Sequence, residues 1–159
     1  MGRSVRLAAS IGFLFLVAGC APPAYLHPDT PNQSAAASVQ ASKAQILDAA
    51  VKTLVQDGYQ ISAVDNATGL VSTAPRAALV TSAQADCGKV KGLLASADPL
   101  TYPQPRTRVA FNILAEDNHI EVRSRIDDLL DSEGTQTDLT CASRGLLDQE
   151  MLDEIKARL

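Results

Sequence analysis

The sequence predicts an α+β fold, in which two helices pack on one face of an antiparallel sheet of about four to five strands. Near each end of residues 42–159, apolar residues recur at intervals of three and four, which is typical of a helix that covers a core. Between these segments, apolar and polar residues alternate in short runs bounded by turn residues, which is typical of half-buried strands. Two cysteines in the same region predict one disulfide.

The first helix is expected over residues 43–57. Ser42 and Gln45 have the spacing of a capping box, which satisfies amide groups that the first helical turn leaves without partners. Gly58 follows at a position where helices often end in a left-handed residue. The apolar stripe of this helix consists of Ile46, Leu47, Ala50, Val51, Leu54 and Val55.

Strands and irregular chain follow this helix. Residues 59–63 and 70–74 have strand patterns, and residues 65–69 between them favour a turn, so we expect a hairpin with the helix lying across it. Residues 77–85 fit either a short helix or an irregular strand. Three prolines make residues 98–106 a loop.

The clearest strand pattern lies in the second half of the chain. Residues 108–115 and 120–126 predict an antiparallel hairpin with one buried and one charged face, because apolar side chains occupy alternate positions. Residues 131–134 predict a further turn. A last strand is expected over residues 136–142 and a closing helix over residues 146–158.

The first twenty residues have the features of an export signal. Arg3 and Arg6 precede an apolar run of 12 residues, which is shorter than the roughly 20 residues that span a bilayer. The run ends in Val17-Ala18-Gly19-Cys20, which resembles the lipobox of bacterial lipoproteins. This resemblance implies that residues 1–19 are removed and that Cys20 is acylated. An uncleaved membrane helix, or an ordinary signal cut at its small residues, is the alternative.

The lipoprotein resemblance also implies a location. Ala21 follows the cysteine, and the absence of aspartate there is similar to lipoproteins of the outer membrane, so we expect a lipid-anchored protein of the bacterial cell envelope that faces the periplasm. Residues 20–41 contain four prolines and an alanine- and serine-rich run, which predicts a flexible tether to one small domain over residues 42–159. Alternatively, the Tyr-Leu-His sequence of residues 25–27 is a docking strip for a partner.

The other two cysteines, Cys87 and Cys141, are an even pair in a chain that is expected to be exported. Because the periplasm is oxidising, we expect them to form a disulfide. This cross-link would close a loop of about 55 residues and stabilise the fold by about 4 kcal/mol on the chain-entropy model. A reactive thiol is the alternative, but the sequence has no CxxC motif and no histidine near either cysteine.

The charge of the chain argues against one class of partner. Of its 14 basic side chains, 12 remain when Arg3 and Arg6 are removed with the signal; against 18 acidic side chains, they leave a net charge of −6. Binding to nucleic acid requires clustered Lys and Arg that neutralise phosphates, and the chain has no such cluster. We therefore expect no nucleic acid partner.

The sequence contains no motif for a catalytic site, a cofactor or a metal. Its two histidines, His27 and His119, lie in the expected tether and in a hairpin turn, which gives little support to a catalytic triad or a zinc site. A group of acidic residues could bind calcium, but its spacing does not match an EF-hand loop, so a solvated turn is the preferred interpretation. The group consists of Asp127, Asp128, Asp131, Glu133 and Asp138.

Four arginines could meet an anionic partner on the outer face of the second hairpin. On a hydrated sheet face, such side chains more often pair with neighbouring carboxylates such as Glu121, and this interpretation is preferred. The arginines are Arg106, Arg108, Arg123 and Arg125.

These observations favour a non-enzymatic lipoprotein that serves as a structural or protein-interaction module of the envelope. Its expected partners are the membrane, through the lipid on Cys20, and an envelope protein. The order of helices and strands is similar to that of small outer-membrane assembly lipoproteins, at the level of the fold alone. The alternative is a periplasm-facing domain that binds a small ligand or a glycan. A hydrolase fits least well, because no suitable acid and base pair is evident.

Overall fold

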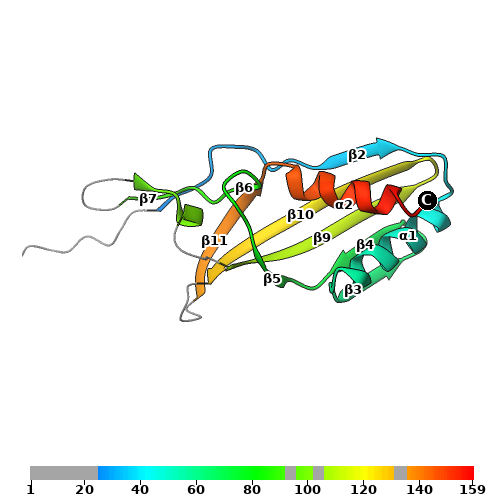
Figure 1. Ribbon diagram of the computed structural model, residues 1–159, viewed down its shortest axis with the longest axis horizontal. Coiled ribbons are helices and arrows are strands. Elements are labelled where there is room, and N and C mark those ends of the chain that lie inside the picture. Colours follow the sequence, from blue (N-terminus) through cyan, green and yellow to red (C-terminus); the bar gives the residue numbers. More distant parts are fainter. Residues whose placement is uncertain (1–24, 92–95, 102–105, 131–135) are drawn as a thin grey trace, which may run out of the picture.

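The computed structural model, which describes residues 25–91, 96–101, 106–130 and 136–159, confirms an α+β fold with a large antiparallel sheet, two helices and one disulfide (Figure 1). The sheet has eight strands, so the expectation of four to five was too low. Five of its strands lie where the sequence predicts them: β3 (Ile61–Asp65), β4 (Leu70–Thr73), β9 (Arg106–Glu116), β10 (His119–Leu130) and β11 (Gln136–Ser143). Three more come from segments with weaker patterns: β2 (Ala35–Ser38), β5 (Arg76–Leu79) and β6 (Ala85–Asp86).

The centre of the sheet is the long hairpin of β9 and β10. Asn118 in its turn has a φ of 63°, a conformation that asparagine tolerates better than most residues. Ile113 lies opposite Val122, so both strands present the same alternate positions to the helices. This confirms the predicted alternation, and the buried residues of this face are Val109, Phe111, Ile113, Ala115, Ile120, Val122 and Ile126.

Different strands flank the two halves of this hairpin. The strand order is β3-β4-β9-β10-β11-β6, while β5 also pairs with β9 and β2 with β10. The sequence allowed either a short helix or a strand for residues 77–85. In the structure, these residues begin in strand β5. On the edge of β10 that faces away from β9, β2 pairs with residues 119–122 and β11 with residues 126–130. Residues 123–125 therefore lie in a gap between two partner strands.

The carboxylate of Asp148, in helix α2 (Leu146–Lys156), fills this gap. It accepts hydrogen bonds from the backbone N–H of Ser124 and from the hydroxyl of Ser143 at the end of β11, and it is fully buried. The Ser143 hydroxyl in turn accepts the N–H of Gly145, the N-cap residue of α2, at 3.1 Å. The first turn of α2 is thus joined to the sheet by polar bonds as well as by its apolar face.

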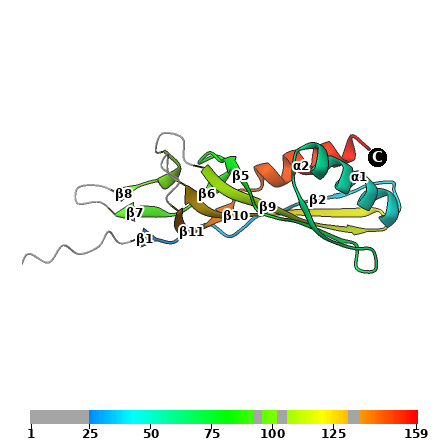
Figure 2. The same cartoon turned by 90° about the horizontal axis from the view of Figure 1, so that it is seen from below.

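Helix α1 (Lys43–Gln56) begins at the predicted capping box. The Ser42 N–H donates to Gln45 Oε1 at 2.9 Å, and the Gln45 N–H donates to Ser42 Oγ at 3.4 Å. Gly58 has a φ of +78° beyond the end of the helix, as predicted. Both helices lie on the same face of the sheet and contact each other (Figure 2). Their fully buried side chains include Ile46, Leu54, Leu152 and Ile155.

The structure corrects the expectation that residues 20–41 are a flexible tether as far as Ala41, because those after residue 24 are joined to the folded chain. β2 is paired along its whole length with β10. The Ser143 N–H donates to Asn32 Oδ1 at 2.6 Å, and the Gln33 N–H donates to the Ser143 carbonyl at 2.9 Å. A segment of small residues and prolines buries too little apolar surface to order itself, but here it is ordered by hydrogen bonds to strands. The folded part therefore extends to the first described residue.

A second, smaller sheet lies at one end of the molecule. Its three antiparallel strands, which we call the end sheet, are β1 (Tyr25–Leu26), β7 (Lys89–Lys91) and β8 (Ser96–Ala97), in the order β1-β7-β8. A short 3₁₀ helix, η1 (Pro99–Thr101), follows β8. Figures 1 and 2 place the end sheet at the opposite end of the long axis from the C-terminus. The turn expected at residues 131–134 lies outside the described residues.

Candidate functional site

The predicted disulfide is confirmed, and it braces the end of the molecule that carries the end sheet. Cys87, between β6 and β7, is bonded to Cys141 in β11 across 54 residues of sequence, with the two Cα atoms 4.1 Å apart. Both cysteines are buried. The disulfide therefore attaches the irregular segment after β6 to a strand of the large sheet.

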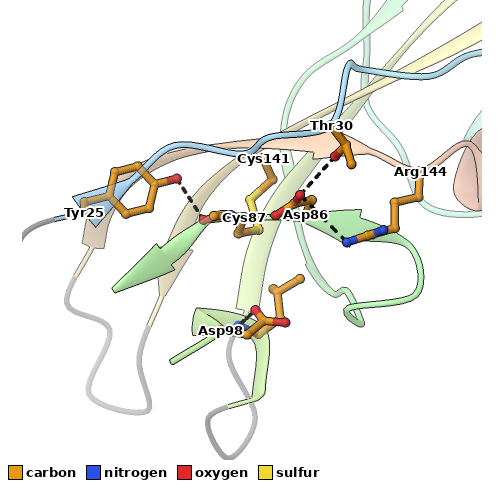
Figure 3. A network of polar contacts seen from close by, with 9 residues as sticks. Tyr25, Thr30, Asp86, Cys87, Asp98, Cys141 and Arg144 are labelled. Carbon is orange, nitrogen blue, oxygen red and sulfur yellow. Dashed lines mark hydrogen bonds and ion pairs between the residues drawn. A yellow bond between two sulfur atoms is a disulfide. The ribbon is translucent and has the colours of Figure 1, made fainter. Parts of the chain in front are cut away.

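Asp86, next to the disulfide, joins three segments of the chain (Figure 3). Its carboxylate accepts the Thr30 hydroxyl at 3.0 Å and the Gly88 N–H at 2.9 Å, and it pairs with the Arg144 guanidinium at 3.8 Å. The hydrogen bond from Gly88 is the main cause that holds the pKa of Asp86 below its usual value; Thr30 and the charges of Arg144 and Lys89 add to it. The carboxylate is therefore ionised at neutral pH and links the N-terminal segment, the β6–β7 turn and the residue after β11.

Tyr25 and Gly88 hold strand β1 against this turn. The Tyr25 hydroxyl donates to the Cys87 carbonyl at 2.8 Å (Figure 3), and the Tyr25 ring meets the His27 ring edge-on at 5.1 Å. Burial, and then the charge of Asp86, raise the pKa of Tyr25, which keeps its hydroxyl a donor. Gly88 has a φ of +73°, and a Cβ there would lie 2.0 Å from the Leu26 carbonyl oxygen, so the close approach of β1 requires glycine.

These contacts border a cleft of about 440 Å³, which we call the disulfide cleft. Asp98 stands at its far side, where its carboxylate accepts the N–H of Leu100 at 2.9 Å. Side chains of both charges surround the opening, so the cleft can pair with a partner or ligand that carries both donors and acceptors. Its lining consists of Leu26, His27, Pro28, Asp29, Asp86, Gly88, Lys89, Asp98 and Arg144.

We expect Asp86→Asn to destabilise the protein at neutral pH by about 1 kcal/mol, because a neutral amide replaces the charged acceptor. The folded-state pKa of Asp86 is lowered, so its contribution is present above the unfolded pKa of about 3.9 and is lost as the pH falls through the folded value. Urea unfolding of both proteins over a pH series measures this difference. The difference in unfolding free energy between the wild type and Asp86→Asn should shrink toward acid pH. The control Asp29→Asn should not reproduce this loss, and a difference for Asp86→Asn that is independent of pH would contradict the prediction.

A second hollow, of about 490 Å³, lies between α1 and the outermost strand β3. Its floor is apolar, with Leu47, Val51 and Val64, and Lys43 and Asp48 stand at its rim. These residues provide packing surface rather than reactive groups.

A third hollow, of about 340 Å³, lies where the end of α1 meets α2. The Arg76 guanidinium lies 4.2 Å from the centre of the Tyr59 ring, which packs edge-on against Phe111 at 5.1 Å. A hydrogen bond with Asp57, followed by partial burial and by the charge of Asp57, raises the pKa of Glu154. The contact of Glu154 with Asp57 is therefore most favourable when Glu154 is protonated.

We expect Glu154→Gln to make the protein more stable than the wild type at neutral pH, where the two carboxylates repel each other. The raised folded-state pKa of Glu154 means that the favourable contact is complete below the unfolded pKa of about 4.3 and is lost as the pH rises through the folded value. Thermal unfolding between acid and neutral pH checks this, with Glu116→Gln at the exposed end of β9 as the control. A glutamine variant with the same pH dependence as the wild type would contradict it.

The structure does not bring the two histidines together. His27 lines the disulfide cleft, whereas His119 begins β10 at the hairpin turn, opposite Glu116 and Ser38. Cys20, the expected lipidation site, and residues 1–19, the expected signal, lie outside the described residues.

The arginines of the second hairpin follow the preferred interpretation where their side chains are described. Arg123 pairs with Glu121 at 2.7 Å and Arg125 with Asp127 at 2.5 Å. Arg108 lies opposite Asp127 in the sheet, and the side chain of Arg106 is outside the description. Of the proposed acidic group, only Asp127 has a described side chain; those of Asp128, Asp131, Glu133 and Asp138 are outside it.

Two further findings apply to the described part of the chain. Within it, no group of three or more His, Cys, Asp or Glu side chains is placed to hold a metal ion. None of the helices in these ranges is long and apolar enough to cross a membrane.

Comparisons with known proteins add little to this site. No family model and no curated protein matches the chain. Among solved structures, it is similar to a DUF4468 family protein from Bacteroides ovatus ATCC 8483, with 17% sequence identity and a TM-score of 0.43. The match covers 67% of this chain and 58% of that one, so the chain spans less than two thirds of the neighbour's length. The description of the disulfide cleft as a candidate site therefore depends on its geometry alone.

Sequence reasoning missed most residues of the disulfide cleft. The order Asp86-Cys87-Gly88 was a usable signal, because an aspartate two residues before a glycine is typical of an Asx turn. Thr30 and Arg144 had no local signal, since their partner Asp86 is more than fifty residues away in the chain.

Proposed function

We propose that this protein is a non-enzymatic, lipid-anchored module of the bacterial cell envelope that binds another envelope protein at the disulfide cleft. The observation that carries the proposal is a cleft with charges of both signs on a framework braced by the Cys87–Cys141 disulfide and the Asp86 contacts. A preformed polar surface of this kind favours binding, because little ordering of side chains is required when the partner arrives. The lipobox-like motif that ends in Cys20 supports the anchor and an outer-membrane location that faces the periplasm.

The role of Asp86 supports binding rather than catalysis. Its oxygens accept hydrogen bonds from Thr30 and Gly88 and face Arg144, so they serve the architecture of the cleft. A general base must instead hold its lone pairs toward a substrate.

A periplasm-facing domain for a small ligand or a glycan is the second candidate. The volume of the cleft, about 440 Å³, favours it, since small-molecule sites commonly occupy some 300–1,000 Å³.

Cross-linking and pull-down of the tagged full-length protein from bacterial membranes test the proposal. We expect one envelope protein to co-purify in a fixed ratio with the wild type and with the control Glu116→Lys, and to be lost from the double variant His27→Glu/Asp29→Lys. Thermal shifts with soluble oligosaccharides that disappear in the same double variant, without a protein partner, would favour the second candidate.

Binding that is unchanged in the double variant would show that the disulfide cleft is not the site. A mature protein with an unmodified Cys20 in mass spectrometry would overturn the lipid anchor. Turnover of an envelope polymer that a single Asp or Glu substitution abolishes would overturn the non-enzymatic role.

A further inference from the structure

Tyr25, the first residue that the structure describes, is close in sequence to the expected lipid. Tyr25 is held by pairing of β1 with β7 and by its hydroxyl bond to the Cys87 carbonyl. Cys20 lies five residues earlier, and five residues reach at most about 18 Å even when fully extended. Resting on the proposed acylation of Cys20, this distance means that the end sheet cannot lie far from the bilayer surface.

We propose that one face of the end sheet is a membrane-contact surface, which rests on the phospholipid headgroups. One face of the end sheet carries Leu26 and Lys89, which lie directly opposite each other in β1 and β7. Lys91, two residues along β7, points to the same side. Leu26 is 40% exposed, and both lysines are exposed.

The state of the lysines distinguishes this face from the rest of the described surface. Lys52 pairs with Asp48 at 2.6 Å, Lys156 pairs with Asp153 at 3.1 Å, and Lys43 donates to the Ala67 carbonyl at 3.0 Å. The remaining two lysines, Lys89 and Lys91, make no hydrogen bond or ion pair with any described residue, although the charge of Lys89 acts on the nearby Asp86 carboxylate. The ammonium group of Lys91 is thus available to an external anion, and that of Lys89 can contact one beside Asp86.

The chemistry of this face matches the interfacial layer of a phospholipid bilayer. Every phospholipid carries a phosphate that an ammonium group can contact, and a lysine can extend along apolar surface to reach it. An exposed leucine beside two lysines places an apolar group next to these charges, which is the composition of interfacial anchors. A lipid on Cys20 would hold this face at the headgroups at high local concentration.

The orientation has a consequence for the rest of the domain. Figures 1 and 2 show the large sheet and its two helices extending away from the end sheet along the long axis. With the end sheet on the membrane, the helices lie toward the end of the long axis that is farther from the anchor. The disulfide cleft, which shares Leu26 and Lys89 with this face, then lies at the membrane surface, within reach of a membrane-embedded partner.

Tryptophan fluorescence measures this orientation, because the chain contains no natural tryptophan. Leu26→Trp and the control Leu159→Trp each introduce one at a partly exposed leucine, at the end sheet and at the opposite end of the molecule. The lipidated full-length proteins are reconstituted in vesicles of phosphatidylethanolamine and phosphatidylglycerol that contain brominated phosphatidylcholine. We expect quenching of the Leu26→Trp protein to exceed that of the control by about twofold or more.

A second measurement uses the unaltered protein. A water-soluble amine-acylating reagent should modify Lys89 and Lys91 more slowly on vesicles than in detergent, while Lys52 and Lys156 react alike in both. Lys89→Glu/Lys91→Glu should lower the quenching of the Leu26→Trp protein, whereas the control pair Lys52→Glu/Lys156→Glu should not. Equal quenching at both ends, or equal labelling of all four lysines, overturns the orientation.

The mass of Cys20 separates the two proposals. An acylated Cys20 without preferential quenching at the end sheet overturns the orientation and leaves the anchor intact. An unmodified Cys20 overturns the anchor, and the orientation with it.

Discussion

Replacing both disulfide cysteines, as Cys87→Ala/Cys141→Ala, is expected to lower the free energy of unfolding by about 4 kcal/mol. The cross-link spans 54 residues, and without it the unfolded chain gains the conformational freedom of that loop. Alanine is the appropriate replacement, because both sulfurs are buried and a serine hydroxyl would add an unsatisfied polar group. The melting temperature should fall by roughly 10–20 °C.

Urea unfolding with and without reductant measures this effect. Reductant should destabilise the wild type to about the level of the double alanine variant and should leave that variant unchanged. A wild-type midpoint that does not respond to full reduction would contradict the prediction.

Asp148→Ala is expected to destabilise the protein by about 3 kcal/mol, although Asp148 does not line the three clefts described above. The substitution leaves the buried Ser124 N–H and the Ser143 hydroxyl without their acceptor, in the gap between β2 and β11. It also removes a negative charge from the first turn of α2, where the helix dipole favours one. Asp148→Asn should cost less, about 1–2 kcal/mol, because the remaining amide oxygen can still accept the Ser124 N–H.

Chemical denaturation compares these variants with Asp153→Ala, which removes an exposed carboxylate from the same helix and should change stability little. Amide hydrogen exchange at Ser124 should become faster in Asp148→Ala. An alanine variant as stable as the Asp153→Ala control would show that the gap in the sheet closes without the carboxylate.

The two predictions concern different parts of one molecule. The disulfide stabilises the end that carries the cleft and the end sheet, where the strands have only two or three residues each. Asp148 stabilises the junction of the helix layer with the long hairpin. For the same loss of unfolding free energy, removal of the disulfide should therefore weaken binding at the cleft more than removal of the Asp148 carboxylate does.

The elements that the sequence predicted well contain their own signals. The capping box of Ser42 and Gln45 and the glycine at position 58 define α1 locally, because the groups that they satisfy lie within one helical turn. The alternation in β9 and β10 reports which face is buried, since a strand presents every second side chain to the same side.

The elements that the sequence did not predict depend on distant partners. β2 is a run of three alanines and a serine, which has no strand pattern and is ordered because β10 offers it a free edge. β1 and β6 have two residues each, too few for any periodicity, and they pair with β7 and β11. Short segments like these have no strand pattern of their own and become strands only where a neighbouring strand supplies their hydrogen bonds.

The sequence by itself determined the fold class, the two helices, the central hairpins and the pairing of Cys87 with Cys141. Each follows from local periodicity or from the parity of cysteines in a chain that is expected to be exported. Only the tertiary structure decided that residues 25–41 are joined to the folded chain, that Asp86 organises a cleft, and that Asp148 fills a gap in the sheet. The physical reason is that a hydrogen bond between residues far apart in the chain leaves no periodic trace in either segment, so it becomes visible only when both segments are folded.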